Sequence, residues 1–174
     1  MIASDITKLA LQFKAEGVSF SVDQFIEHLQ RVLSAGTILI PAYTDNLRNG
    51  DVFDRQKSKP TTGALSNRIM RRKDFHRTKD PLHSVFVWGR HTDELLSLND
   101  KSTFGSYSVF GFLDRVHAKM IIIDVHFENS FTYVHYIEEK LKVKFRKPYH
   151  LKYTLVDKGE SSEEEIIFYT KRPG

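Results

Sequence analysis

Two histidines, each with a carboxylate close by in the sequence, are the residues best suited to chemistry. His83 follows Asp80 by three positions and stands just before the apolar run Val85–Gly89. Later in the chain, His135 and Glu138 are again three positions apart. An imidazole that a carboxylate orients is a general base that works near neutral pH. We therefore predict an enzyme in which His83 is the base and Glu138 or Asp80 orients it.

A metal centre is the alternative use of these groups. On one helix, His135 and Glu138 face the same side, where they can form a hydrogen bond or share a metal ion. A catalytic metal needs a further ligand, and the remaining candidates lack tight ligand spacing. These candidates are Asp80, His83, Asp124 and His126. We therefore expect no metal site.

The composition is that of a packed globular protein. The 174 residues are 40% hydrophobic and 12% aromatic, which predicts one domain over residues 1–174 with an aromatic-rich core. Because the sequence has no cysteine, disulfides, thiolate metal ligands and a cysteine acyl-enzyme are excluded. No apolar run is long enough to cross a bilayer, and the first residues lack a signal pattern. We expect a soluble, cytoplasmic protein.

The net charge of +4 is concentrated in one basic segment. Such a patch favours a phosphate-bearing partner, although a solvated helix face explains a charge run as well. A nucleic-acid binder or metal nuclease that uses this segment with Asp80, His83 and Asp124 is a further alternative. The segment lacks the interleaved aromatic residues of a base-stacking surface. Its basic residues are Arg68, Arg71, Arg72, Lys73, Arg77 and Lys79.

Helices and strands alternate along most of the chain. Ser21 and Gln24 form a capping-box pattern, after which apolar residues follow one helical face over residues 22–33 until Gly36. Thr37–Pro41 is short, apolar and β-branched, which is typical of a buried strand. Further helices are expected at 63–72, 91–98, 108–116 and 131–141, and further strands at 84–89 and 119–124, the last one buried.

Two regions depart from this alternation. Residues 42–62 are polar and without period, which predicts a long loop of the kind that carries function. Near the C-terminus, residues 143–157 and 165–171 alternate like strands, with a turn at Asp157-Lys158-Gly159 and an acidic loop between them. We therefore predict an α/β protein, a layered sheet flanked by helices, with an antiparallel appendage at the C-terminal end.

The segment Thr61–Ser66 opens a predicted helix with small hydroxylated residues and Gly63. Free N–H groups at a helix start favour an anion, so a phosphate can rest there. The segment lacks the lysine and the glycine spacing of nucleotide-binding loops. Ordinary helix capping explains these residues about as well.

An ordered string of short motifs runs along the chain. It comprises Gly36–Pro41 with Tyr43-Thr44, Val52–Asp54, Thr61–Leu65, Asp80-Pro81-Leu82-His83-Ser84 with Gly89, Ser108–Gly111 and Thr132–Glu138. The string resembles the antibiotic N-acetyltransferase family, whose best-known members are the aminoglycoside 3-N-acetyltransferases. The opening Ala3–Ile6 is similar to the end of the family's N-terminal strand, with Ala3 where histidine is usual. Members are longer at both ends, so we expect this chain to be truncated relative to them.

The resemblance implies acetyl transfer from acetyl-coenzyme A to the amine of an aminoglycoside or amino sugar. We expect direct attack in a ternary complex, with a Ser84 acyl-enzyme as the alternative mechanism and a non-catalytic coenzyme A-binding remnant as the alternative function. The coenzyme's phosphates would give the basic segment its partner. The implied catalytic residues are His83, Glu138, Asp80 and His135, and the implied cofactor-binding residues are Ser4, Asp5, Tyr43, Thr44, Thr62, Gly63, Ser84 and Ser108.

The Asp-Pro at positions 80 and 81 stands where family members commonly have His-Pro. In this it resembles relatives that modify cell-surface polysaccharides, which makes an amino sugar the expected acceptor. The expected partners are thus acetyl-coenzyme A and an amino sugar, without nucleic acid or membrane. A homodimer is left open.

Overall fold

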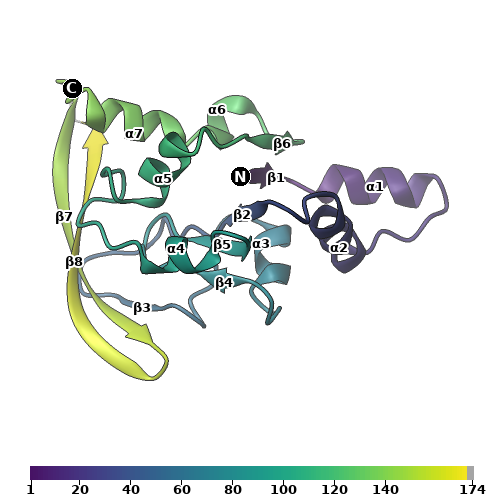
Figure 1. Ribbon diagram of the computed structural model, residues 1–174, viewed down its shortest axis with the longest axis horizontal. Coiled ribbons are helices and arrows are strands. Elements are labelled where there is room, and N and C mark those ends of the chain that lie inside the picture. Colours follow the sequence, from purple (N-terminus) through teal and green to yellow (C-terminus); the bar gives the residue numbers. More distant parts are fainter. Residues whose placement is uncertain (172–174) are drawn as a thin grey trace.

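The computed structural model describes residues 1–171 and is a mixed α/β protein with several small sheets and surrounding helices (Figure 1). The predicted fold class is confirmed. The helices are α1 (Thr7–Ala15), α2 (Val22–Val32), α3 (Ala64–Ile69), α4 (Thr92–Ser97), α5 (Val109–Arg115), α6 (Phe127–Ser130) and α7 (Tyr133–Lys140). The strands are β1 (Ile2–Ser4), β2 (Thr37–Pro41), β3 (Val52–Asp54), β4 (His76–Arg77), β5 (Val85–Gly89), β6 (Ile121–Ile123), β7 (Arg146–Asp157) and β8 (Glu160–Lys171).

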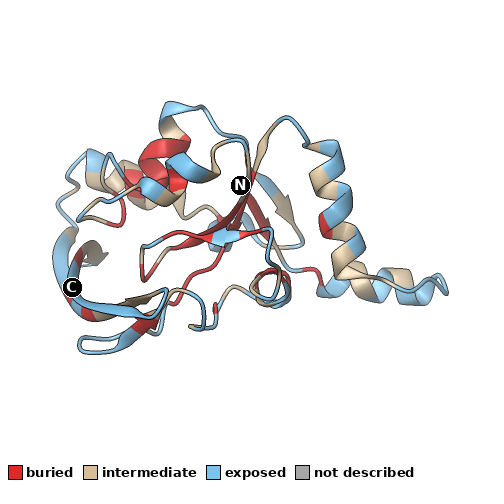
Figure 2. Cartoon of the chain, turned by 60° about the horizontal axis from the view of Figure 1, so that its bottom comes forward, coloured by how far each residue is buried: buried red, intermediate tan, exposed pale blue. Residues whose placement is uncertain are grey.

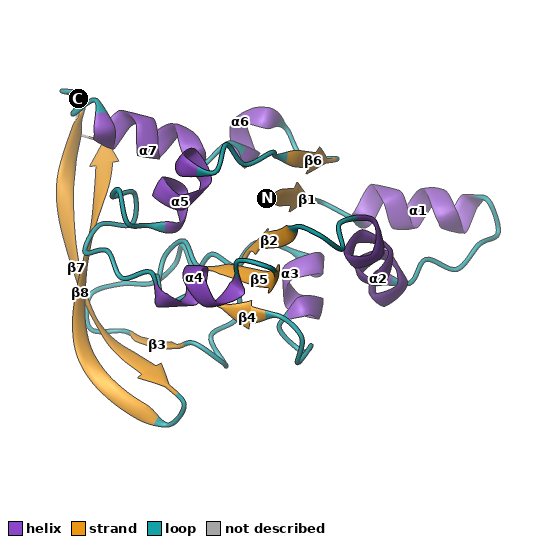
Figure 3. Cartoon of the chain, in the orientation of Figure 1, coloured by secondary structure: helices purple, strands orange, loops and turns teal. Residues whose placement is uncertain are grey.

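These strands form three small sheets. In the central sheet, β5 lies between β2 and β4, and both pairs are antiparallel. Strand β1 pairs in parallel with β6 and also packs beside β2. Strand β3 joins the hairpin of β7 and β8 through a parallel pair with β7. The hairpin stands along one side of the molecule, and α1 and α2 lie on the opposite side (Figure 3).

The predicted unit of helix, tight turn and strand is confirmed at α2 and β2. Ser21 caps α2, because its hydroxyl accepts the backbone N–H of Gln24 at 3.3 Å. Gly89 at the end of β5 has a φ of +109° and lies against the turn before β2. A Cβ at this position would collide with the Gly36 carbonyl oxygen. Glycine is therefore required where β5 passes the turn.

Hydrophobic clusters cover both faces of the central sheet. Val85 and Val87 of β5 belong to one cluster, which Phe110 and Phe112 of α5 close. Phe86 belongs to the other cluster, beneath α2 and α3. Figure 2 shows buried residues, in red, on strands in the middle of the molecule and on a helix to one side of them. Phenylalanines are among the largest fully buried side chains, which confirms the predicted aromatic-rich core.

The C-terminal appendage is antiparallel, as predicted, but its acidic segment is not a loop. Strand β8 begins at Glu160, and Glu165 lies opposite Lys152 of β7. Pairing with β7 along 12 residues outweighs the low strand preference of glutamate. The predicted loop over residues 42–62 likewise contains a strand, β3, which pairs with β7.

Two further details differ from the sequence prediction. Strand β6 is where it was expected, but Ile121 is exposed, so the strand is not buried. Helices α1 and α6 were not predicted, because neither shows a strong apolar face; α1 has no buried residue. None of the helices within residues 1–171 combines the length and apolar character that a membrane span needs.

Candidate active site

A cleft of about 380 Å³ lies where β1, the end of β2 and the segment of α6 and α7 meet. His83 and His135 both line it, although they come from different loops and helices. Ser4, Tyr43 and Thr62 line it as well. The cleft thus brings together five of the predicted site residues from distant parts of the chain.

The His83 ring is enclosed by aromatic side chains. The ring centroids of Tyr43, Phe104 and Phe110 lie 4.7, 5.0 and 6.2 Å from its own. Its Nδ1 is buried without a hydrogen-bond partner among residues 1–171. Burial, aided by His135, lowers the pKa of His83 to about 3, because apolar surroundings disfavour the charged ring. The imidazole is therefore uncharged at neutral pH.

The loop before β5 fixes the backbone of His83. The Asp80 carboxylate accepts the N–H groups of Leu82 and His83 at 2.8 and 2.7 Å. Thr44 binds the loop from the other side: its N–H donates to the Leu82 carbonyl at 3.0 Å, and its hydroxyl donates to the Pro81 carbonyl. The sequence predicted that Asp80 could orient the imidazole ring. Its carboxylate instead binds the backbone beside the ring.

Ser84 also belongs to the support of the site. It is fully buried, its hydroxyl donates to the Ala42 carbonyl at 2.8 Å, and it accepts Nε–H of Arg77 at 2.9 Å. Its bonds are internal, and it does not line the cleft. Neither an acyl-enzyme on Ser84 nor a cofactor contact fits this placement.

His135 meets Glu138 in α7, as the spacing predicts. Nδ1 of His135 is 2.7 Å from Oε2 of Glu138, and Nε of Arg146 in β7 is 2.8 Å from the same oxygen. Burial raises the pKa of Glu138, but the contacts with His135 and Arg146 outweigh it and hold that pKa below its usual range. The carboxylate thus contacts His135 and Arg146, and the predicted pair of His83 with Glu138 does not form.

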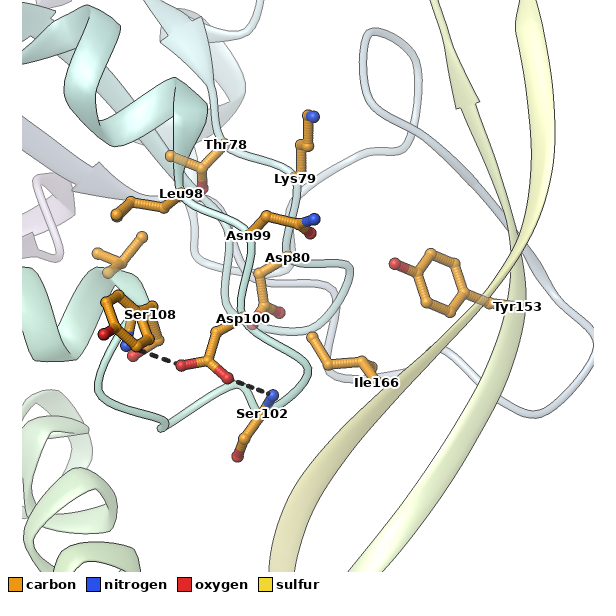
Figure 4. Close-up of a pocket in the computed structure, with 12 residues that line it drawn as sticks. Thr78, Lys79, Asp80, Leu98, Asn99, Asp100, Ser102, Ser108, Tyr153 and Ile166 are labelled. Atoms are coloured by element: carbon orange, nitrogen blue, oxygen red, sulfur yellow. Dashed lines mark hydrogen bonds between the residues drawn. The ribbon is translucent and has the colours of Figure 1, made fainter.

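Asp80 lines a separate and much smaller pocket of about 50 Å³, together with Asp100, Ser108 and Tyr153 (Figure 4). Burial raises the pKa of Asp80, although the backbone N–H groups of the His83 loop oppose the rise. Ser108 caps α5, since its hydroxyl accepts the Gly111 N–H at 3.2 Å. Asp80 and Ser108, both predicted for the active site, therefore do not line its cleft.

The other residues predicted to bind the cofactor have local structural roles. Asp5 is exposed and accepts the N–H of Thr7 at 2.9 Å. Gly63 precedes α3 with a φ of +96°, a conformation that favours glycine. Thr62 lines the cleft, but its hydroxyl already donates to the Pro41 carbonyl at 2.8 Å.

The basic segment does not line the cleft. Arg68 pairs with Asp23 of α2, and Arg72 pairs with Asp74 at 2.8 Å. Arg77 is buried. Internal contacts therefore occupy three of the arginines that were expected to meet phosphate groups, Arg68, Arg72 and Arg77.

The charged walls of the cleft are acidic. Asp45 and Glu128 line it together with the two imidazoles, and its lining contains no lysine or arginine among the described residues. Burial raises the pKa of Asp45, although a hydrogen bond from the Thr61 hydroxyl at 3.1 Å opposes the rise. Such walls attract a cation such as an ammonium group. Within residues 1–171, no group of three or more histidine, aspartate or glutamate side chains is placed to hold a metal ion.

Sequence reasoning missed Asp45, Glu128 and Arg146. Asp45 directly follows Tyr43-Thr44, so its place in that motif was a usable signal. Glu128 and Arg146 reach the site only through the packing of α6 and β7, for which no local pattern exists.

The model of the family Aminoglycoside 3-N-acetyltransferase matches residues 11–171. The chain therefore belongs to this family, and the predicted resemblance is confirmed. None of the curated proteins matches the chain in sequence.

Solved structures share the fold. YokD from Bacillus subtilis superimposes with a TM-score of 0.80 at 16% identity, covering 98% of this chain and 74% of YokD. AAC-IIIb, solved as a binary complex with CoASH, gives 0.74 at 15% identity, covering 86% of this chain and 63% of AAC-IIIb. The apoenzyme of AAC(3)-IVa gives 0.67 at 20% identity, covering 87% of this chain and 57% of that one. The chain thus spans less than two thirds of these two acetyltransferases.

Proposed function

We propose that this chain is an acetyl-coenzyme A-dependent N-acetyltransferase that acts on the amine of an aminoglycoside or amino sugar, with His83 as general base. Family and fold support an acyltransferase. The observation that carries the proposal is an uncharged His83 ring in a cleft whose other charged walls are carboxylates.

The acidic walls suit an amine acceptor. An amino sugar arrives mainly as an ammonium ion, which Asp45 and Glu128 attract toward the cleft. A related structure supports this class of acceptor, because a histidine-to-alanine mutant of AAC(3)-IVa was solved in complex with apramycin. The two carboxylates thus serve to concentrate and orient the acceptor.

His83 moves the proton. The ammonium ion first loses one proton to water, because only the neutral amine has the electron pair that attacks the thioester. As the new bond to nitrogen forms, this amine becomes strongly acidic, so even a weakly basic imidazole accepts its second proton. The aromatic surroundings of His83 disfavour the imidazolium, so the ring passes the proton on to the departing sulfur. His135, fixed by Glu138 and Arg146, lies on the same cleft and stabilises the bound acceptor.

Acetyl-coenzyme A supplies an acetyl thioester when bound, and AAC-IIIb, which shares this fold, was solved with CoASH. Ser4 and Tyr43 would hold its thioester end, because they line the same cleft as His83. No lysine or arginine among the described residues lines this cleft. The phosphate groups therefore fit outside it.

A transfer assay tests the proposal. The protein is incubated with acetyl-coenzyme A and a panel of aminoglycosides and amino sugars, and free thiol is followed together with the mass of the acetylated product. The control acceptors are matching sugars with a hydroxyl in place of the amine. We expect free thiol to be released with the amine acceptors and not with the hydroxyl controls. Release of equal size with the hydroxyl sugars, or none with any amine, would contradict the proposal.

A further inference from the structure

A second and larger cavity, of about 750 Å³, lies at the β4 edge of the central sheet, bordered by α4 and the tip of the β7–β8 hairpin. It shares no lining residue with the His83 cleft, which lies at the β2 edge. Two carboxylates, Asp93 and Asp157, line it. The basic side chains that line it are Arg55, Arg72, His76, Arg77, Lys79 and Lys158.

Only part of this positive charge is neutralised within the protein. Arg55 pairs with Asp157 at 2.6 Å, and Arg72 pairs with Asp74 at 2.8 Å. Lys79 and Lys158 are exposed and take part in no ion pair within residues 1–171. The wall therefore carries two cations that are available to a ligand.

Arg77 adds a buried charge that forms no ion pair with a carboxylate of residues 1–171. Its guanidinium donates to Ser84 Oγ and to the carbonyls of Ser58 and Ala42, and it stacks over Phe53 at 4.8 Å. These acceptors are neutral. Burial lowers the pKa of Arg77 to about 10, so the group stays charged at neutral pH. A buried cation without a counterion is costly, and an anion nearby lowers that cost.

We propose that this cavity is a second ligand site, which takes a phosphate-bearing small molecule. Lys79 and Lys158 contact the phosphate from two sides of the opening, the loop after β4 and the hairpin tip, and Arg77 supplies positive potential from within. The site is distinct from the one that holds the acetyl donor. The paired Arg55 and Asp157 fix the hairpin tip, and with it Lys158, against the loop that follows β3.

Calorimetry with inorganic pyrophosphate at constant ionic strength tests this site. The double variant Lys79→Gln/Lys158→Gln changes two exposed side chains, so the fold is retained. Its matched control is Lys8→Gln/Lys147→Gln, which removes two exposed cations outside the cavity. We expect at least a tenfold loss of pyrophosphate affinity in the first variant and unchanged affinity in the second.

Coenzyme A also carries phosphates, so the titration is repeated with saturating coenzyme A. The second site is supported if pyrophosphate still binds in the presence of saturating coenzyme A and if only Lys79→Gln/Lys158→Gln loses this binding. Competition between pyrophosphate and coenzyme A would overturn it, as would an equal loss in both variants or no pyrophosphate binding to the parent protein. These binding measurements can be interpreted even if the acetyl-transfer assay fails, because none of them depends on turnover.

Discussion

The two cavities at opposite edges of the central sheet carry opposite charge. The cleft at the β2 edge is lined by Asp45 and Glu128 around an uncharged His83, whereas the cavity at the β4 edge is lined mainly by basic side chains. One short sheet therefore separates a wall that attracts ammonium from a wall that attracts phosphate. The net charge of +4 is thus the sum of an acidic cleft, a basic cavity and the rest of the surface, and it does not describe either cavity by itself.

Removing the imidazole from the acidic cleft should have the largest effect. His83→Ala should lower kcat/KM for acetyl transfer about 10²- to 10⁴-fold, the usual contribution of a general base. His28→Ala, at an exposed position on α2, is the matched control and should keep full activity. Equal activity of His83→Ala and the parent protein would show that the cleft does not work through this residue.

The buried cation between the two cavities should matter chiefly for stability. Arg77→Met removes the side-chain donor to Ser84 Oγ and to the Ser58 carbonyl, and one of the two side-chain donors to the Ala42 carbonyl. We expect a loss of about 3 kcal/mol in the free energy of unfolding, measured by urea denaturation. Arg71→Met, at an exposed position nearby, should change it by less than about 0.5 kcal/mol. Similar values for both variants would refute the supporting role of Arg77.

The uncharged state of His83 should also appear as acid sensitivity. Its pKa is about 3 in the folded protein and about 6.5 in the unfolded chain, so between pH 6 and pH 4 only the unfolded chain binds this proton. Stability then falls with decreasing pH, by up to about 1.4 kcal/mol per pH unit. In His83→Asn this slope should be shallower by that amount. An unchanged slope would mean that the folded protein protonates His83 normally.

A smaller effect should distinguish the carboxylates of the two cavities. Asp45→Asn weakens the attraction of the cleft for an ammonium ion and should raise KM for the amine about fivefold, or about 1 kcal/mol, with kcat unchanged. Asp93→Asn makes the same change in the basic cavity and should leave KM as it is. If both variants raised KM alike, the effect would come from overall charge rather than from the cleft.

Local sequence signals predicted the elements better than the site. The capping of α2 by Ser21 and the contact of His135 with Glu138 each depend on residues three positions apart, so the sequence spacing is sufficient. Other features depend on contacts between distant segments. Glu138 of α7 meets Arg146 of β7, and strand β3 forms by pairing with β7. Such long-range contacts leave no local pattern.

The same distinction explains the misplaced charges. Arg68 and Arg72 look like a phosphate site in sequence, but α2 brings Asp23 against both of them. His83 was expected to have a carboxylate partner, and the fold surrounds its ring with Tyr43 and Phe104 instead. The motif predicted His83 as the reactive residue, and only the packing shows that burial lowers the pKa of its ring.

The most direct test of the account is the titration of the His83 imidazole by nitrogen NMR, assigned with His83→Asn. We expect this ring to remain neutral from pH 8 down to pH 5, because its aromatic surroundings and His135 disfavour the charged form. A titration midpoint near 6.5 would contradict the account, since the cleft would then hold an ordinary, solvated histidine.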